Sequence, residues 1–158
     1  SNTDSQWQIG ATAIGQGNTV ISPIHAAMLV SAIANGGTLM EPYVIDSVQS
    51  TEGSVIEQYE SENYGTLMSA SESSQLTKMM KAVVEEGTGY KLSGKNYSVA
   101  GKTGTAEVVG RGNNAWFVGF APADDPKIAI CVLVEDAGTA SSEAVPIAGE
   151  ILDAYLNN

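Results

Sequence analysis

One short run, Lys102-Thr103-Gly104-Thr105, combines a cation, two hydroxyls and a glycine in a segment typical of a strand. Side chains alternate along a strand, so Thr103 and Thr105 share one face and Lys102 starts from the other. Gly104 lies between the threonines and has no side chain that would keep a ligand from the backbone. The run predicts a binding edge for a ligand that carries a carboxylate.

Gly101-Lys102-Thr103 also looks like the end of a phosphate-binding loop. That loop needs another glycine five residues before the Gly-Lys pair and a helix after it. The position in question is Asn96, and no helical start signal follows Thr103. The net charge of −11 is a poor background for nucleotide phosphates and for nucleic acids. We therefore expect no nucleotide and no nucleic-acid partner.

The carboxylate-binding run is one of several blocks that occur together in this chain. The others are Ile14-Gly15-Gln16-Gly17, Ser22-Pro23, Ala34-Asn35-Gly36-Gly37, Glu85-Glu86-Gly87-Thr88-Gly89 and Ala115-Trp116-Phe117-Val118-Gly119-Phe120-Ala121-Pro122. In their types and order they resemble the penicillin-binding transpeptidases, kin to the serine β-lactamases, whose third motif is Lys-Thr-Gly on a strand. The resemblance covers most of the chain.

The resemblance implies a role for each residue of the Lys102 run. Lys102 would supply positive potential near a nucleophile and near the ligand carboxylate, and the Thr103 and Thr105 hydroxyls would bind that carboxylate. The N–H of Thr105 would be an oxyanion-hole donor beside Gly104, a kind of contact worth about 2.7–4 kcal/mol in the transition state. The implied ligands are peptidoglycan stem peptides and β-lactams, and no cofactor is implied.

The nucleophile of this family, a serine in a Ser-x-x-Lys motif, has no counterpart in the chain, and neither has the Ser-x-Asn motif in its proper order. The triplet Ser61-Glu62-Asn63 lies after Gly15-Gln16-Gly17, in the wrong order and in an acidic stretch. Residues 1–158 are therefore interpreted as the C-terminal portion of a transpeptidase domain, inactive alone because nucleophile, base and oxyanion donors act as a unit. The alternatives are a β-lactamase or β-lactam sensor fragment, or a non-catalytic binding or assembly module.

The composition indicates what class of protein the chain is and which kinds of site it has too few residues to form. The hydrophobic fraction of 43% and charged fraction of 16% are those of a globular domain. Cys131 is the only cysteine and His25 the only histidine, which leaves too few ligands for a zinc site. No apolar run is long enough to span a membrane. The resemblance implies that residues 1–158 come from a longer protein, here called the parent, that has an upstream membrane anchor and lies outside the cell membrane. An exposed sheet edge would favour a homodimer.

The pattern predicts an α/β protein of the α+β type, with helices packed on an antiparallel sheet. Helices are expected after Ser22-Pro23, after the capping box at Ser69, and after a cap at Ser141 or Ser142. A small hairpin is expected from Tyr43-Val44-Ile45 and Val55-Ile56, and 60–69 is expected to be a loop. The Lys102 strand should be the edge of a sheet completed by 115–121 and 127–135.

Overall fold

A computed structural model of the chain describes residues 9, 20–108 and 110–157. Its elements, in chain order, are α2 (Pro23–Ala34), β1 (Thr38–Met40), β2 (Ser47–Gln49), β3 (Val55–Gln58), β4 (Asn63–Thr66), α3 (Ala70–Glu85), a 3-10 turn η1 (Tyr90–Leu92), β5 (Ala100–Ala106), β6 (Asn113–Ala121), β7 (Ile128–Ala137) and α4 (Ala144–Leu156). The block around Gln16 lies outside the described residues.

The main sheet has the strand order β5-β6-β7 and is antiparallel throughout. Within the described part of the chain, β5 is an edge strand of this sheet, as the sequence predicts, because it pairs with β6 alone. Lys102 lies opposite Val118, and Thr103 lies opposite Phe117. This register fixes which face of the sheet each residue of the Lys102 run occupies.

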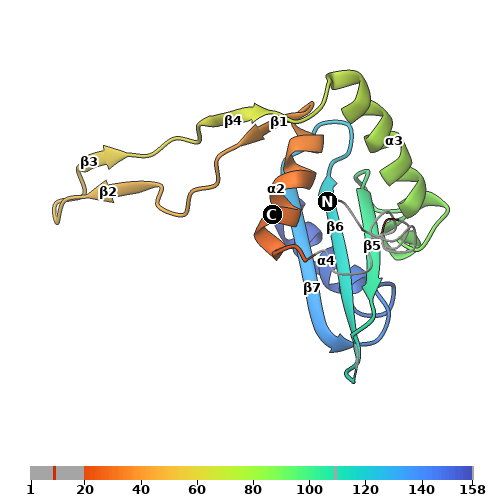
Figure 1. Cartoon of the computed structure of the whole chain (residues 1–158). Helices are drawn as coiled ribbons and strands as arrows, with labels where there is room; N and C mark the ends of the chain where they lie inside the picture. The colour runs from red at the N-terminus through yellow and green to blue at the C-terminus, as the bar shows by residue number, and fades with distance from the viewer. Residues whose placement is uncertain (1–8, 10–19, 109, 158) are drawn as a thin grey trace, which may run out of the picture.

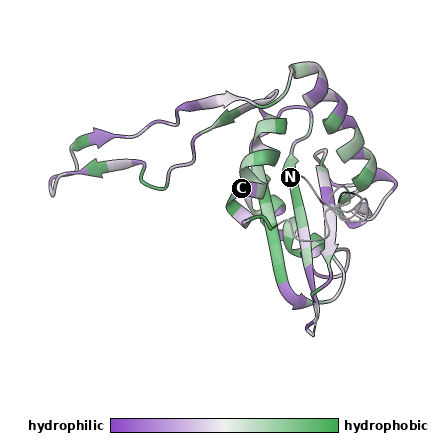
Figure 2. Cartoon of the chain, viewed as in Figure 1, coloured by the Kyte–Doolittle hydropathy of each residue, from purple (hydrophilic) through white to green (hydrophobic). Residues whose placement is uncertain are grey.

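Helices cover both faces of this sheet (Figure 1). α2 and α3 pack on one face, and α4 packs on the other. The strands β6 and β7 are the most hydrophobic part of the sheet, while β5 is pale and mixed (Figure 2). Phe117 and Leu152 are fully buried between the sheet and α4, and Phe120 is fully buried toward α2 and α3. The predicted fold class is confirmed.

The first two helices begin where their sequences predict. Ser22 caps α2, accepting the N–H of His25 with its hydroxyl, and proline occupies the first turn. Ser69 and Glu72 form the capping box of α3, with each side chain bonded to the other's backbone N–H.

Three predictions of secondary structure are wrong. The first strand of the hairpin is Ser47–Gln49 rather than Tyr43-Val44-Ile45. The supposed loop 60–69 contains the strand β4, which pairs with β1. Neither Ser141 nor Ser142 caps α4, which begins after Glu143 without a side-chain cap. The hydroxyls of those two serines bond elsewhere, to loop backbone at Thr88 and Thr139.

The paired strands β1–β4 and β2–β3 form a long arm that extends away from the body of the molecule (Figure 1). Many of its large side chains are exposed, and Val44 is 100% exposed. The base of the arm, near Met40 and Tyr43, lines a surface hollow together with α2. The arm therefore contributes little to the core.

Candidate functional site

The strand β5 presents its Lys102-Thr103-Gly104-Thr105 run on two faces. Lys102 lies on the sheet face against which α2 and α3 pack, but its side chain remains exposed. Thr103 lies on the face toward α4 and is 7% exposed. Thr105 is half-buried on the same face as Thr103. The alternation predicted from the sequence is therefore present, on a strand that is at the edge of the sheet within the described residues.

Lys102 lies at the rim of an apolar groove. The groove has a volume of about 530 Å³ and is lined by α2, α3 and β6, with Leu29, Leu76 and Met79 among its walls. The Lys102 ammonium donates to the Thr103 carbonyl at 2.5 Å. The cation is thus held over the strand at a surface that is otherwise almost entirely apolar.

On the opposite face, two loops hold the threonine hydroxyls of β5. The Thr103 and Thr88 hydroxyl oxygens lie 2.5 Å apart, with either one as donor. The Thr105 hydroxyl accepts the N–H of Ala140 at 3.2 Å. The two loops are themselves joined, because the Ser141 hydroxyl donates to the Thr88 carbonyl at 2.9 Å.

The backbone of β5 is held close to β6 by a pair of glycines. Gly101 lies opposite Gly119, and the Phe117 ring lies against both. A Cβ added at Gly101 would overlap that ring, and one added at Gly119 would meet the Ala100 carbonyl oxygen at 2.6 Å. The start of the strand that carries Lys102 is therefore fixed by packing.

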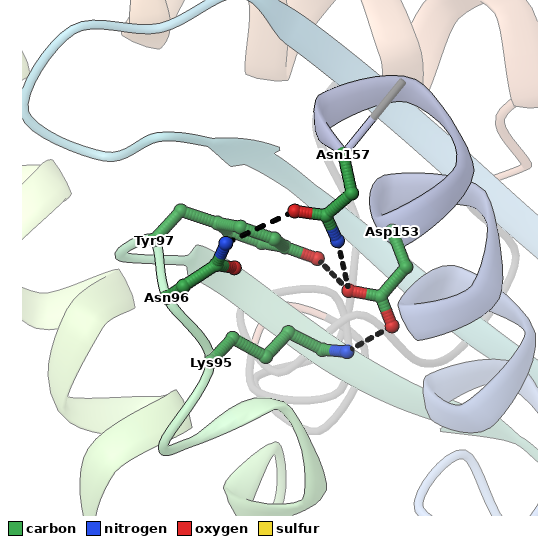
Figure 3. A network of polar contacts seen from close by, with 5 residues as sticks. All are labelled: Lys95, Asn96, Tyr97, Asp153 and Asn157. Carbon is green, nitrogen blue, oxygen red and sulfur yellow. Dashed lines mark hydrogen bonds and ion pairs between the residues drawn. The ribbon is translucent and has the colours of Figure 1, made fainter.

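The segment before β5 is tied to α4 by a polar network (Figure 3). Asp153 accepts the Tyr97 hydroxyl at 2.6 Å and pairs with the Lys95 ammonium at 2.5 Å. The Asn96 side chain donates to the side-chain oxygen of Asn157, the residue that follows the last residue of α4. The hydrogen bond from Lys95, and then that from Tyr97, lowers the pKa of Asp153. Burial, and then the bond to Asp153, raises the pKa of Tyr97 well above its ordinary value.

A second carboxylate holds the same segment from another direction. Asp124, in the turn between β6 and β7, accepts the Ser98 hydroxyl at 2.8 Å and the Lys81 ammonium at 3.1 Å. The bond from Ser98, and then that from Lys81, lowers the pKa of Asp124. The N–H of Ala123 donates to the Ser98 hydroxyl at 3.0 Å. Ser98 thus links the turn to the strand that begins two residues later.

Other sequence features lie away from this edge. Ser61-Glu62-Asn63 is part of the arm, where Ser61 donates to the Glu41 carbonyl and Asn63 accepts the N–H of Gly65. Across residues 20–108 and 110–157, no group of three or more His, Cys, Asp and Glu side chains could hold a metal ion. No helix in the same residues is long and apolar enough to cross a membrane.

Sequence reasoning missed the partners that hold β5. Thr88 belongs to a block that the sequence singled out, but no spacing rule connects it to Thr103. Asp153 lies in the last turns of α4 and reads as an ordinary surface carboxylate. These contacts form only when the loops and α4 pack against the sheet.

Comparison with known proteins identifies the family to which this sequence is similar. The profile of the penicillin binding protein transpeptidase domain matches residues 1–153. The chain is 34% identical over 157 residues to the peptidoglycan D,D-transpeptidase PbpA of Mycolicibacterium smegmatis, covering 94% of the chain and 32% of that protein. It is 33% identical over 175 residues to the peptidoglycan D,D-transpeptidase MrdA of Haemophilus influenzae, covering 96% of the chain and 26% of that protein.

Among solved structures, the chain is similar to the ceftriaxone acyl-enzyme complex of penicillin-binding protein A from M. tuberculosis. The TM-score is 0.87 at 32% identity, covering 94% of this chain and 35% of that one. The chain spans about a quarter to a third of the length of the relatives that it matches.

Proposed function

The chain belongs to the transpeptidase domain family of penicillin-binding proteins, and from this we propose that it forms part of a peptidoglycan D,D-transpeptidase. The proposed reaction is acyl transfer from a stem peptide to an acceptor amine through a serine ester, and β-lactams would acylate the same serine. The observation that carries the proposal is the Lys102-Thr103-Gly104-Thr105 run on the edge strand β5. We propose the extracytoplasmic face of the cell membrane as its location.

The geometry of β5 supports a binding role for each residue. An extended peptide-like ligand can lie along a strand edge, which places its carboxylate near the hydroxyls of Thr103 and Thr105. Lys102, on the other face, would add positive potential and stabilise both the carboxylate and a deprotonated nucleophile. The N–H of Thr105 would donate to the developing oxyanion, and Gly104 has no side chain that would crowd this part of the strand.

The nucleophile and its lysine base would come from a segment upstream of residues 1–158. That segment must approach Lys102, and the apolar groove between α2 and α3 is the surface beside Lys102 that such a segment would cover. We therefore propose that the chain alone binds without reacting. We also propose that the exposed groove makes the isolated chain self-associate.

The experiment measures the intact mass of each protein after incubation with penicillin G. The proteins are this chain, the longer parent that includes the upstream segment, and that parent with Lys102→Ala. A matched control is Lys127→Ala, which removes a surface lysine paired with Asp125. We expect an adduct on the parent and on the control, a slower adduct with Lys102→Ala, and none on the chain alone. An adduct on the chain alone would reveal a nucleophile within it, and no adduct on the parent would overturn the transpeptidase proposal.

A further inference from the structure

We propose that Thr88 is a positioning residue for the Thr103 hydroxyl, and that the Ser141 hydroxyl holds Thr88 in place for this task. The inference rests on the proposed function, because it assumes that Thr103 donates to a ligand carboxylate. It adds to the β5 strand a second layer of residues, drawn from the loop after α3 and the loop before α4.

The first step concerns protons. Two hydroxyls 2.5 Å apart share one hydrogen between their oxygens, so the pair keeps one O–H to direct elsewhere. When Thr88 donates to Thr103, the Thr103 proton is directed toward another acceptor. A hydroxyl that already accepts a hydrogen bond is also a better donor, because neighbouring bonds polarise one another. A carboxylate at β5 would therefore select the arrangement in which Thr88 is the donor.

The second step concerns access and orientation. Thr103 is 7% exposed, so its hydroxyl has few directions in which to find a partner. Its own carbonyl is held by the Lys102 ammonium on the other side of the strand. Thr88 is exposed, and its hydroxyl approaches from the loop that ends α3. The hydroxyl of Thr88 thus decides how the one buried hydroxyl of the motif is turned.

The third step concerns what fixes Thr88. Its carbonyl accepts the Ser141 hydroxyl at 2.9 Å. The loop of Ser141 is itself held, because Thr139 and Ser142 exchange hydrogen bonds and the Ala140 N–H donates to Thr105. The same loop therefore orients Thr105 directly and Thr103 through Thr88. Both carboxylate-binding hydroxyls of the motif would be set by one loop.

The test uses the parent extended upstream and two probes, penicillin G and its methyl ester. The second-order acylation rate constant is measured for wild type, Thr88→Val, Thr88→Ser and Ser141→Ala. Valine keeps the shape of threonine and removes the hydroxyl. We expect Thr88→Val to slow acylation by penicillin G about tenfold or more, as loss of a hydrogen bond to a charged group does. Thr88→Ser should restore most of the rate, and Ser141→Ala should show an intermediate loss.

The ester distinguishes orientation from general damage. It has no carboxylate charge, so the Thr88→Val loss should fall to about twofold or less with this probe. The control Thr77→Val makes the same change on α3, where the hydroxyl donates to the Ser73 carbonyl one turn earlier, and should leave both rates unchanged. Thermal melting of every variant verifies that it folds.

The outcomes separate this inference from the proposed function. Equal losses with acid and ester, or a full rate in Thr88→Val with penicillin G, would overturn the role of Thr88 while the transpeptidase proposal stands. Failure of Thr88→Ser to recover would also contradict a role for the hydroxyl. Absence of any adduct on the wild-type parent would instead overturn the proposed function itself.

Discussion

Gly101 and Gly104 stand three residues apart on β5, yet the structure surrounds them differently. A Cβ at Gly101 would overlap the Phe117 ring, which is fully buried and cannot move aside cheaply. A Cβ at Gly104 would meet its nearest neighbour, the Trp116 Cβ, at 3.4 Å, which is ordinary contact. Gly101 is therefore required for packing between β5 and β6, whereas the space beside Gly104 is not filled by the core.

We predict that Gly101→Ala in the parent protein lowers the free energy of unfolding by about 1–3 kcal/mol, the usual effect of overpacking a core. Gly104→Ala should change it by less than about 0.5 kcal/mol. Its effect should instead be a several-fold slower acylation by penicillin G, because the new methyl group would crowd the backbone along which the proposed ligand would lie. Urea unfolding and adduct formation measure the two effects. Equal stability losses, or a Gly104→Ala protein that is acylated at the wild-type rate, would contradict this division.

At the same scale, the sequence predicted the strand that carries Lys102 and Thr103 and the faces that they occupy, but not the contacts that hold this strand. The alternation of side chains along a strand is a local property, so the local pattern was sufficient for that part. The contact between Thr88 and Thr103 spans fifteen residues. It depends on where a loop packs, and no periodicity encodes that.

Among the elements, the main strands were predictable because apolar runs bounded by polar turns specify them. The hairpin was misplaced because Tyr43-Val44-Ile45 has β-branched and aromatic residues but no strand partner. The turn decides instead: the Ser50 hydroxyl accepts the N–H groups of Glu52 and Ser54, and the pairing then uses Ser47–Gln49. A turn built by one serine side chain outweighed strand propensity.

The contact of α4 with the segment before β5 has a definite pH dependence. The pKa of Asp153 is lowered in the folded protein from an ordinary value of 3.8. A depressed pKa means that the carboxylate stabilises the fold above about pH 4, and that this contribution is lost as the pH falls through the folded-state pKa. The raised pKa of Tyr97 has the opposite sign, so its contribution is present below about pH 10 and lost above it.

We predict that Asp153→Asn lowers the unfolding midpoint between about pH 5 and pH 9, and that the gap to wild type narrows below about pH 4. The matched control is Asp125→Asn, because Asp125 pairs with Lys127 on the surface and is 77% exposed. That change should have little effect at any pH. Chemical denaturation across the pH range makes the measurement. A gap for Asp153→Asn that stays constant down to pH 2 would rule out the proposed titration.

Taken as a whole, the molecule consists of a packed body and an arm that adds little to it. The strand β2 pairs with β3, and Val44 and Ile56 are 100% and 69% exposed. Replacing residues 44–59 with a short turn should therefore change the free energy of unfolding by less than about 1 kcal/mol. Leu152→Ala, at a fully buried position in the body, should cost about 2–5 kcal/mol. Comparable losses in the two variants would show that the arm packs on the body.

The last prediction follows from the apolar groove and the net charge together. Leu29 and Met79 line the groove and are 46% and 58% exposed, so burying them between two copies of the chain would be favourable. Each copy carries a net charge of −11, and the repulsion between copies weakens as salt shortens the screening length to about 8 Å at 0.15 M. Self-association of the isolated chain should therefore increase with salt.

This self-association should fall in a Leu29→Gln, Met79→Gln variant but not in Val44→Gln, which changes a fully exposed residue of the arm. Sedimentation equilibrium measures the association. The parent extended upstream should stay monomeric if its own chain covers the groove, whereas a monomeric isolated chain at every salt concentration would show that the groove does not drive assembly.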